Sequence, residues 1–273
     1  MKIVTLMEDT ACAPGFACEH GLSFYIETDG RKLLFDMGQT DLFLQNATAC
    51  GVDLSAVDTA FVSHGHYDHG GGLAAFLDVN DHAPVYVHKK TFEPHFSHKP
   101  EGVKPIGLDA ALAENPRLRR VSGVTQIDDC LTLFSDITGA DCVPQGNRTL
   151  YEREGEGYGP DRFIHEQSLI VREGDKAVLF TGCAHRGVVN ICARAKELLG
   201  RDPDVVVGGM HLFSPSTGKS EPDENIRAVA ERLADTDSSY YTCHCTGPHA
   251  YDVLRETLGE RIAFLAAGGI IAV

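Results

Sequence analysis

The chain has 273 residues, of which 43% are hydrophobic, and its formal net charge at pH 7 is −15. This apolar fraction supports a folded core and excludes a largely disordered chain, and the length suits one large domain. The negative charge argues against nucleic-acid or anionic-membrane binding, since both need basic surfaces. A local basic pocket for an anionic small-molecule substrate is compatible with this charge, and the oligomeric state stays open.

The sequence shows no export or membrane signal. No segment approaches the roughly 18 apolar residues of a membrane span. The apolar N-terminal stretch is too short for a signal peptide, because Glu8 and Asp9 follow it. We therefore expect a cytoplasmic protein whose nine cysteines are mostly reduced thiols.

The first third of the chain alternates strand-like and turn-like patterns. Asp29-Gly30 predicts a tight hairpin turn between two strands, and the glycines at 70–72 allow a sharp turn into a helix. In chain order we expect strands over 22–28 and 32–35, a helix over 41–50, a strand over 58–63, a helix around 73–77 and a strand over 85–87.

The middle of the chain, from about 93 to 160, is rich in proline and holds a glycine-rich acidic stretch at 154–159. We interpret it as strands and long loops that form an insert or lid facing the substrate. We expect the histidines in or near this segment, which are His88, His95 and His98, to lie at the surface.

The last third alternates strands and helices more regularly. We expect strands over 168–171 and 177–180, a helix over 188–199, a strand over 204–207, a helix over 221–233, a strand over 239–242, a helix over 248–258, and strands over 262–265 and 270–273. Strands followed by α/β alternation in both halves predict an α/β fold, a four-layer αβ/βα sandwich formed as one domain over 1–273.

The densest chemical signal is the run His64-Gly65-His66-Tyr67-Asp68-His69, which directly follows the strand expected over 58–63. Neutral imidazole and carboxylate are usual ligands of zinc, manganese and iron. His64 and His66 suit one ion, and Asp68 with His69 suits a second. Two ions about 3.5–4 Å apart share a hydroxide and lower the pKa of water toward about 7.

One run cannot complete two metal sites, so further ligands must come from distant positions. Three segments place a histidine at the carboxyl end of an apolar run, where the sites of α/β proteins collect. They are Thr181-Gly182-Cys183-Ala184-His185, Val207-Gly208-Gly209-Met210-His211 and Thr242-Cys243-His244-Cys245. The cysteines among them are small buried residues or further ligands, and burial is the commoner role.

Two segments follow candidate histidines and begin expected helices. They are Arg186-Gly187 and Thr246-Gly247. A helix N-terminus offers N–H groups and a partial positive charge to phosphate, although ordinary capping explains each segment equally well. Their position beside candidate ligands predicts that Arg186, Gly187, Thr246 and Gly247 bind an anionic substrate.

The His-x-His-x-Asp-His run, preceded by Phe35-Asp36-Met37-Gly38, resembles the metallo-β-lactamase superfamily. Three further segments are similar to its dihydropterin-phosphate synthase-like group, named for a synthase in methanopterin-type cofactor assembly. They are Glu19-His20-Gly21-Leu22-Ser23, Thr181-Gly182-Cys183-Ala184-His185-Arg186-Gly187 and His244-Cys245-Thr246-Gly247. The resemblance covers most of the chain outside the middle segment and implies the metallo-β-lactamase type of sandwich.

The superfamily pattern also implies a distribution of ligands. It gives His64 and His66 to the first ion and Asp68 and His69 to the second. We assign His185 to the first ion and His244 to the second, and His211 competes with His244. Cys183 stands where many superfamily hydrolases have a bridging Asp, so it either weakens one site or binds metal itself. Asp36 orients a ligand or serves as a simple turn residue.

The resemblance implies a metal-dependent hydrolase or transferase in which Asp68 acts as the acid/base group. Diiron oxygen reductases have a carboxylate where this chain has His66, which favours two zinc ions, with manganese or iron as alternatives. The substrate is expected to be a phosphorylated or ester-type small molecule. It is either hydrolysed or condensed, as a dihydropterin diphosphate is with an arylamine, with loss of diphosphate.

The alternative function is non-catalytic: a metal-binding or redox-sensing protein that keeps the fold. Cys183 in place of the bridging acid motivates this hypothesis, as do the two cysteines that flank His244.

Overall fold

The chain folds into two compact units in this computed structural model, which describes residues 1–99 and 102–273. Unit 1 comprises 1–94, 106–122 and 265–273, and unit 2 comprises the described parts of 95–105 together with 123–264. The segment 93–160, expected as a loop-rich insert, contributes strands to both units. No helix in the described ranges is long and apolar enough to cross a membrane.

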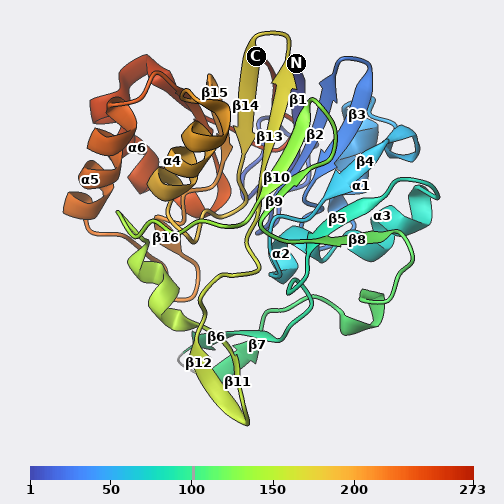
Figure 1. Cartoon of the computed structure of the whole chain (residues 1–273), viewed down its shortest axis with the longest axis horizontal. Coiled ribbons are helices and arrows are strands. Elements are labelled where there is room, and N and C mark those ends of the chain that lie inside the picture. Colours follow the sequence, from blue (N-terminus) through green and yellow to red (C-terminus); the bar gives the residue numbers. More distant parts are fainter. Residues whose placement is uncertain (100–101) are drawn as a thin grey trace. The chain divides into compact units, whose positions relative to one another are not determined.

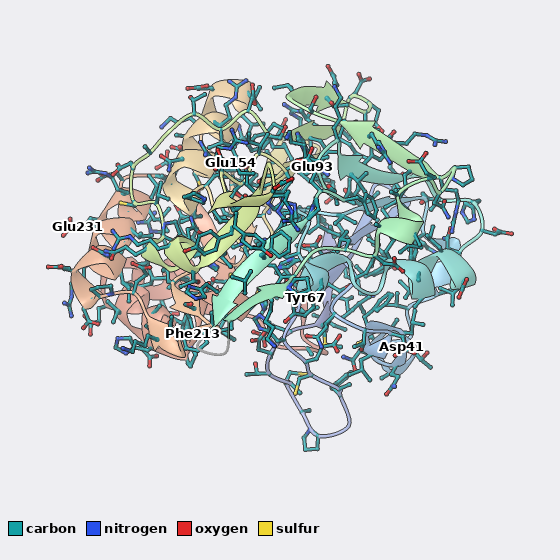
Figure 2. The ribbon with its side chains drawn as sticks, turned by 90° about the horizontal axis from the view of Figure 1, so that it is seen from below. Asp41, Tyr67, Glu93, Glu154, Phe213 and Glu231 are labelled. Carbon is teal, nitrogen blue, oxygen red and sulfur yellow. The ribbon has the colours of Figure 1, made fainter. Side chains whose placement is uncertain are left out.

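Unit 1 is built on a seven-stranded mixed sheet with strand order β20-β1-β2-β3-β4-β5-β8 (Figure 1). Its strands are β1 (Lys2–Met7), β2 (Ser23–Thr28), β3 (Arg31–Phe35), β4 (Thr59–Phe61), β5 (Val85–His88), β8 (Leu118–Val121) and β20 (Ile270–Ala272). Its helices are α1 (Leu42–Ala49), α2 (Tyr67–Gly70) and α3 (Leu73–Val79). Figure 2 labels Asp41, directly before α1, and Tyr67, the first residue of α2.

The hairpin expected around Asp29-Gly30 is confirmed. Asp29 and Gly30 have φ values of 45° and 76°, the left-handed pair that a two-residue type I′ turn requires. Strands β3, β4 and β5 are parallel, which requires crossover connections such as those that contain α1 and α3. Phe35 of β3 pairs with Phe61 of β4, so the residues that follow these two strands leave the sheet at the same edge.

Unit 2 contains a second seven-stranded mixed sheet, with strand order β19-β18-β15-β14-β13-β10-β9. Its strands are β9 (Val124–Gln126), β10 (Leu131–Phe134), β13 (Ser168–Glu173), β14 (Lys176–Phe180), β15 (Val205–Gly208), β18 (Ser239–Thr242) and β19 (Ile262–Phe264). The helices α4 (Val188–Leu199), α5 (Asp223–Ala234) and α6 (Pro248–Leu258) lie on one side of it (Figure 1). Their apolar faces and the sheet share one buried core.

The rest of unit 2 consists of small sheets and short turns. A four-stranded sheet has the order β12-β11-β6-β7, and β16 pairs with β17. The bounds are β6 (His95–Lys99), β7 (Gly102–Pro105), β11 (Leu150–Glu154), β12 (Gly157–Pro160), β16 (Phe213–Ser214) and β17 (Lys219–Ser220). A 3-10 turn over Gln145–Thr149 precedes β11.

The topology of unit 2 positions the candidate ligands. Strands β14, β15 and β18 are parallel neighbours, so their carboxyl ends meet at one edge of the sheet. His185, His211 and His244 each follow one of these ends within five residues. The expected elements of the last third are confirmed, and α4, β18 and α6 have the predicted bounds.

Replacing the Phe76 side chain tests the core of unit 1. Phe76 lies on α3, is fully buried and packs in the hydrophobic core, so Phe76→Ala should lower the free energy of unfolding by about 3–5 kcal/mol. Val79, on the same helix, is 41% exposed, and Val79→Ala should change it by less than about 0.5 kcal/mol. Urea unfolding curves measure both, and equal effects would contradict this packing.

Candidate metal centre

The histidine run of unit 1 is buried and its side chains converge. His64 and His69 are fully buried, and His66 and Asp68 are 4% and 8% exposed. The distance from Nε2 of His64 to Nδ1 of His66 is 3.1 Å. Two nitrogens bound to one tetrahedral zinc are about 3.3 Å apart, because Zn–N bonds measure about 2.0–2.1 Å. These two atoms therefore have the spacing of a chelating pair.

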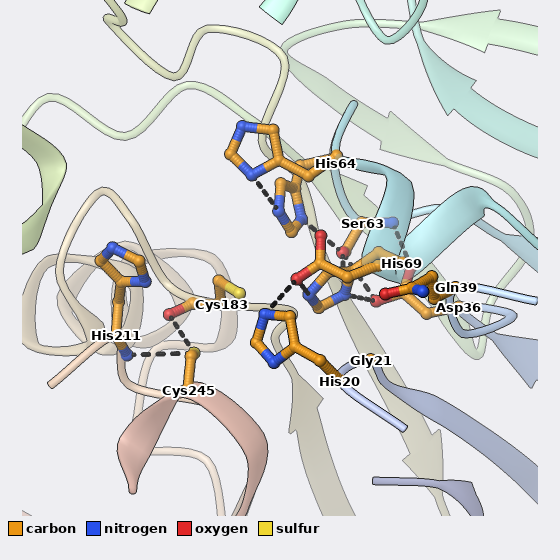
Figure 3. A network of polar contacts seen from close by, with 12 residues as sticks. His20, Gly21, Asp36, Gln39, Ser63, His64, His69, Cys183, His211 and Cys245 are labelled. Carbon is orange, nitrogen blue, oxygen red and sulfur yellow. Dashed lines mark hydrogen bonds and ion pairs between the residues drawn. The ribbon is translucent and has the colours of Figure 1, made fainter. Parts of the chain in front are cut away.

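Hydrogen bonds to Asp36 and Ser63 set the tautomers of two of these rings (Figure 3). Nδ1 of His69 lies 2.6 Å from Oδ2 of Asp36, and a carboxylate accepts only, so this nitrogen carries the proton. The Ser63 hydroxyl donates to Asp36 and lies 2.9 Å from Nδ1 of His64, so it accepts from that ring. Both rings thus present a neutral Nε2 lone pair, the form that binds metal.

Asp68 has two histidine neighbours within unit 1. Its Oδ2 lies 3.8 Å from Nε2 of His69 and 3.2 Å from Nε2 of His20. The other nitrogen of His20, Nδ1, lies 2.9 Å from a carboxylate oxygen of Asp9. His20 therefore bridges two carboxylates and orients Asp68. His20 lies in one of the family-like segments of the sequence, but no role was predicted for it.

The candidate ligands of unit 2 gather around the Cys183 thiol. The sulfur lies within 4.8 Å of a ligand atom from each of four side chains, which are His185, His211, His244 and Cys245. All five residues are at most 6% exposed. The structure therefore brings the three strand-end segments together within unit 2. Both His211 and His244, which the sequence left as competitors, belong to the cluster around Cys183.

His211 shows most directly that this cluster suits a metal ion. Its side chain is 6% exposed, and neither ring nitrogen has a hydrogen-bond partner among the described residues. Burying a polar group without a partner costs about 1–3 kcal/mol. Its backbone φ of 47° is also left-handed, a conformation that costs a non-glycine residue energy. A bound cation would satisfy the imidazole.

Asn147 and Phe163 hold the His185 side chain in place. Nδ1 lies 3.0 Å from the side-chain oxygen of Asn147, whose amide nitrogen donates to the carbonyl of His185. The Phe163 ring stacks on the imidazole at 4.4 Å with an interplanar angle of 7°. Asn147 thereby keeps the proton on Nδ1 and leaves Nε2 as the ligand atom. Neither Asn147 nor Phe163 was predicted, because both lie in or just beyond the middle segment, where the sequence shows no periodicity.

Cys245 has an unusual thiol. Burial acts to raise its pKa, but the contacts with Cys183 and His211 and the nearby His244 imidazole lower that pKa well below its ordinary value. The amide of His211 donates to Sγ at 3.3 Å (Figure 3). Gly209 is needed here, since a Cβ at that position would lie 2.6 Å from the same sulfur. Cys245 is thus chemically suited to be a metal ligand or a redox-active thiol.

The backbone amides at Arg186-Gly187, where an anion site was expected, already have hydrogen-bond partners within unit 2. The carboxylate of Glu166 accepts the amide N–H groups of His185 and Arg186 at 2.6 and 2.8 Å, and the Gly187 amide donates to Ala184. Glu166 is 1% exposed, and burial raises its pKa to about 7 although these two hydrogen bonds act to lower it. Glu166 thus already accepts the amides of His185 and Arg186, and the assignment of Arg186 and Gly187 to substrate binding stays a prediction.

Thr246 and Gly247 are buried as well. The Thr246 hydroxyl lies 2.6 Å from that of Thr242 and accepts from the amide of Met210. Phe213 packs against Gly247, where an added Cβ would approach to 2.7 Å. These contacts hold the turn that carries His244, and the assignment of both residues to substrate binding stays a prediction.

A buried histidine–aspartate cluster lies elsewhere in unit 2. Oδ2 of Asp161 is 2.8 Å from Nδ1 of His95 and 3.3 Å from Nε2 of His165, and Oδ1 accepts the amide of Phe163. The expectation that His88 and His95 lie at the surface is wrong: they are 4% and 2% exposed. Partners far away in sequence, which no local pattern reveals, bury His95.

Comparison with known proteins agrees with these observations. The family model of the metallo-beta-lactamase superfamily matches residues 17–209. The chain is 26% identical to a 7,8-dihydropterin-6-methyl-4-(beta-D-ribofuranosyl)-aminobenzene-5'-phosphate synthase of Methanocaldococcus jannaschii, and the match covers 99% of this chain and 96% of the relative. An uncharacterised protein of the same organism is also 26% identical, with 90% and 91% covered.

A solved structure described as a metal-dependent hydrolase of the beta-lactamase superfamily resembles the chain along its whole length. The TM-score is 0.84 at 29% identity, and the match covers 100% of this chain and 99% of the other. The two mixed sheets and their helices are therefore those of the metallo-beta-lactamase fold, and the predicted α/β class is confirmed. On this evidence the chain belongs to the metallo-beta-lactamase superfamily.

Proposed function

We propose that this chain is a metal-dependent enzyme that uses two divalent ions to act on an anionic small molecule. The observation that carries the proposal is the pair formed by His64 Nε2 and His66 Nδ1, 3.1 Å apart and buried. The buried His211 ring, whose nitrogens have no hydrogen-bond partner among the described residues, supports it from unit 2.

The ligand assignment follows the family pattern. His64, His66 and His185 serve the first ion, and Asp68, His69 and His244 serve the second. Cys183 and His211 are additional donors, because the Cys183 thiol has ligand atoms of His185, His211 and His244 within 4.8 Å. Imidazole and thiolate donors together favour zinc over a hard cation such as magnesium, while manganese and iron are the alternatives.

The bound ions supply polarisation of a substrate oxygen and a water whose pKa falls toward about 7. The chain's own residues orient the ligands and transfer the proton. Asp36 and Asn147 keep the protons of His69 and His185 on Nδ1. Asp68, oriented by His20 at 3.2 Å, holds or releases a proton as the acid/base group.

The relatives guide the choice of substrate. One is named as a synthase whose product carries a 5'-phosphate, and another is described as a metal-dependent hydrolase. We propose a phosphorylated or ester-type substrate, which is either hydrolysed or condensed with loss of diphosphate. Both reactions need a stabilised anionic oxygen, so the same donors serve either.

Metal analysis of the purified protein followed by a substrate panel tests this proposal. The panel contains phosphodiesters, phosphomonoesters, lactones and a dihydropterin diphosphate with an arylamine. Two equivalents of divalent metal with turnover of a panel member support it. Iron that cycles with redox agents, without turnover, would instead favour a redox sensor, a function that the low pKa of the Cys245 thiol suits.

Removing the charge of Asp36 tests its effect on the metal-binding tautomer. Asp36→Asn should weaken metal binding about 10–100-fold, because the carboxylate that accepts from His69 is lost. Asp58→Asn is the matched control: Asp58 is exposed, directly precedes β4 and accepts the backbone amide of Lys32. Competition with a chromophoric chelator measures both affinities. Equal affinities in the two variants would refute the role of Asp36.

Removal of one ligand tests the first metal site. His66→Ala should lose one equivalent of metal and reduce the rate about 100-fold or more, while circular dichroism stays that of the wild type. His82→Ala, at an exposed position of the same unit, should keep both. Full metal content and full activity in His66→Ala would show that the ligand assignment is wrong.

A further inference from the structure

Unit 2 contains a cavity of about 470 Å³ with His185 in its wall. This volume suits a small-molecule ligand, since such pockets measure about 300–1,000 Å³. The wall is mixed in character. Phe163, Pro160 and Val143 form apolar parts, and Arg148 and Arg186 are among the polar residues.

The charged side chains in the wall are three arginines and one aspartate, which are Arg148, Arg162, Arg186 and Asp161. Two of these four side chains already interact with other residues of unit 2. Arg162 forms an ion pair with Glu152, and Asp161 binds His95 and His165. Two guanidinium groups remain, in a protein whose net charge is −15.

Neither remaining guanidinium has a carboxylate partner among the described residues. The Arg148 side chain makes no hydrogen bond or ion pair with the described part of the chain. Arg186 donates to the backbone carbonyls of Ile137 and Arg162, at 2.7 and 3.1 Å. These carbonyls fix the direction of the Arg186 side chain without neutralising its charge, so the cavity keeps a net positive wall.

The 3-10 turn over Gln145–Thr149 joins this wall to the candidate metal ligand. Asn147 of the turn orients the His185 ring, and the next residue, Arg148, lines the cavity. The amide of Gly146 is bonded to Glu221 at 2.9 Å, which anchors the turn. A ligand that contacts Arg148 therefore lies beside the residue that positions His185.

We propose that this cavity binds the phosphate group of the substrate, and that Arg148 is the residue that determines this specificity. The inference deepens the proposed function and rests on it. A phosphate monoester carries a charge of about −1.5 to −2 at pH 7, which two otherwise uncompensated arginines match. A carboxylate neutralises only one of them. Guanidinium groups also bind phosphate through paired hydrogen bonds.

Calorimetric titration of the metal-loaded protein with inorganic phosphate tests the proposal. Arg148→Gln should raise the Kd for phosphate about 10-fold or more, because charge-assisted hydrogen bonds are lost. Arg148→Lys keeps the charge but not the planar fork, so we expect an intermediate Kd. Arg255→Gln removes an arginine from the exposed face of α6, where its side chain is 54% exposed, and should leave the Kd unchanged.

Three results would overturn the proposal. They are no phosphate binding by the wild type, the same Kd in the wild type and Arg148→Gln, or acetate binding as tight as phosphate binding. Arg148 is exposed, so its variants should fold, and the metal content of each sample checks this. A protein that binds no metal but still shows an Arg148-dependent Kd would refute the proposed function and keep the phosphate site. Normal turnover together with a Kd for phosphate that does not depend on Arg148 would refute the phosphate site and keep the proposed function.

Discussion

The burial of imidazole nitrogens is the constraint on which the site depends. A buried nitrogen without a partner is costly, yet both ring nitrogens of His211 are buried without a hydrogen bond among the described residues. In unit 1, His64 and His66 bring two nitrogens to 3.1 Å, a spacing that suits one shared cation. The unpartnered His211 imidazole costs stability in the protein alone and becomes favourable when a metal ion binds, which couples metal affinity to folding.

The backbone meets this constraint at the ends of parallel strands. Left-handed φ values between 47° and 60° occur at Asp36, Ala184, His211 and His244. His211 and His244 are candidate ligands themselves, Ala184 directly precedes His185, and Asp36 bonds to the His69 ring. Regular strand or helix geometry would point these side chains away from the candidate metal ligands. The turns therefore hold backbone strain at the candidate metal site. The partners Asp36 and Asn147 then select the tautomer of the rings they contact.

Local patterns were sufficient to predict much of this architecture. The His64–His69 run was located by its local density of histidines after an apolar strand, and the bounds predicted for α4 and α6 match the structure. Glu166 was not predicted, because its partners lie 19 and 20 residues away. Nor was the burial of His95, whose aspartate is 66 residues distant. Such contacts depend on tertiary structure, and no motif in the sequence marks them.

Anomalous scattering from crystals of the metal-replete protein shows directly whether His64 and His66 share one metal ion. We expect a peak about 2.0–2.1 Å from both Nε2 of His64 and Nδ1 of His66, as for zinc bound by imidazole. A structure of the metal-replete protein in which these two nitrogens turn apart, with no peak between them, would contradict it.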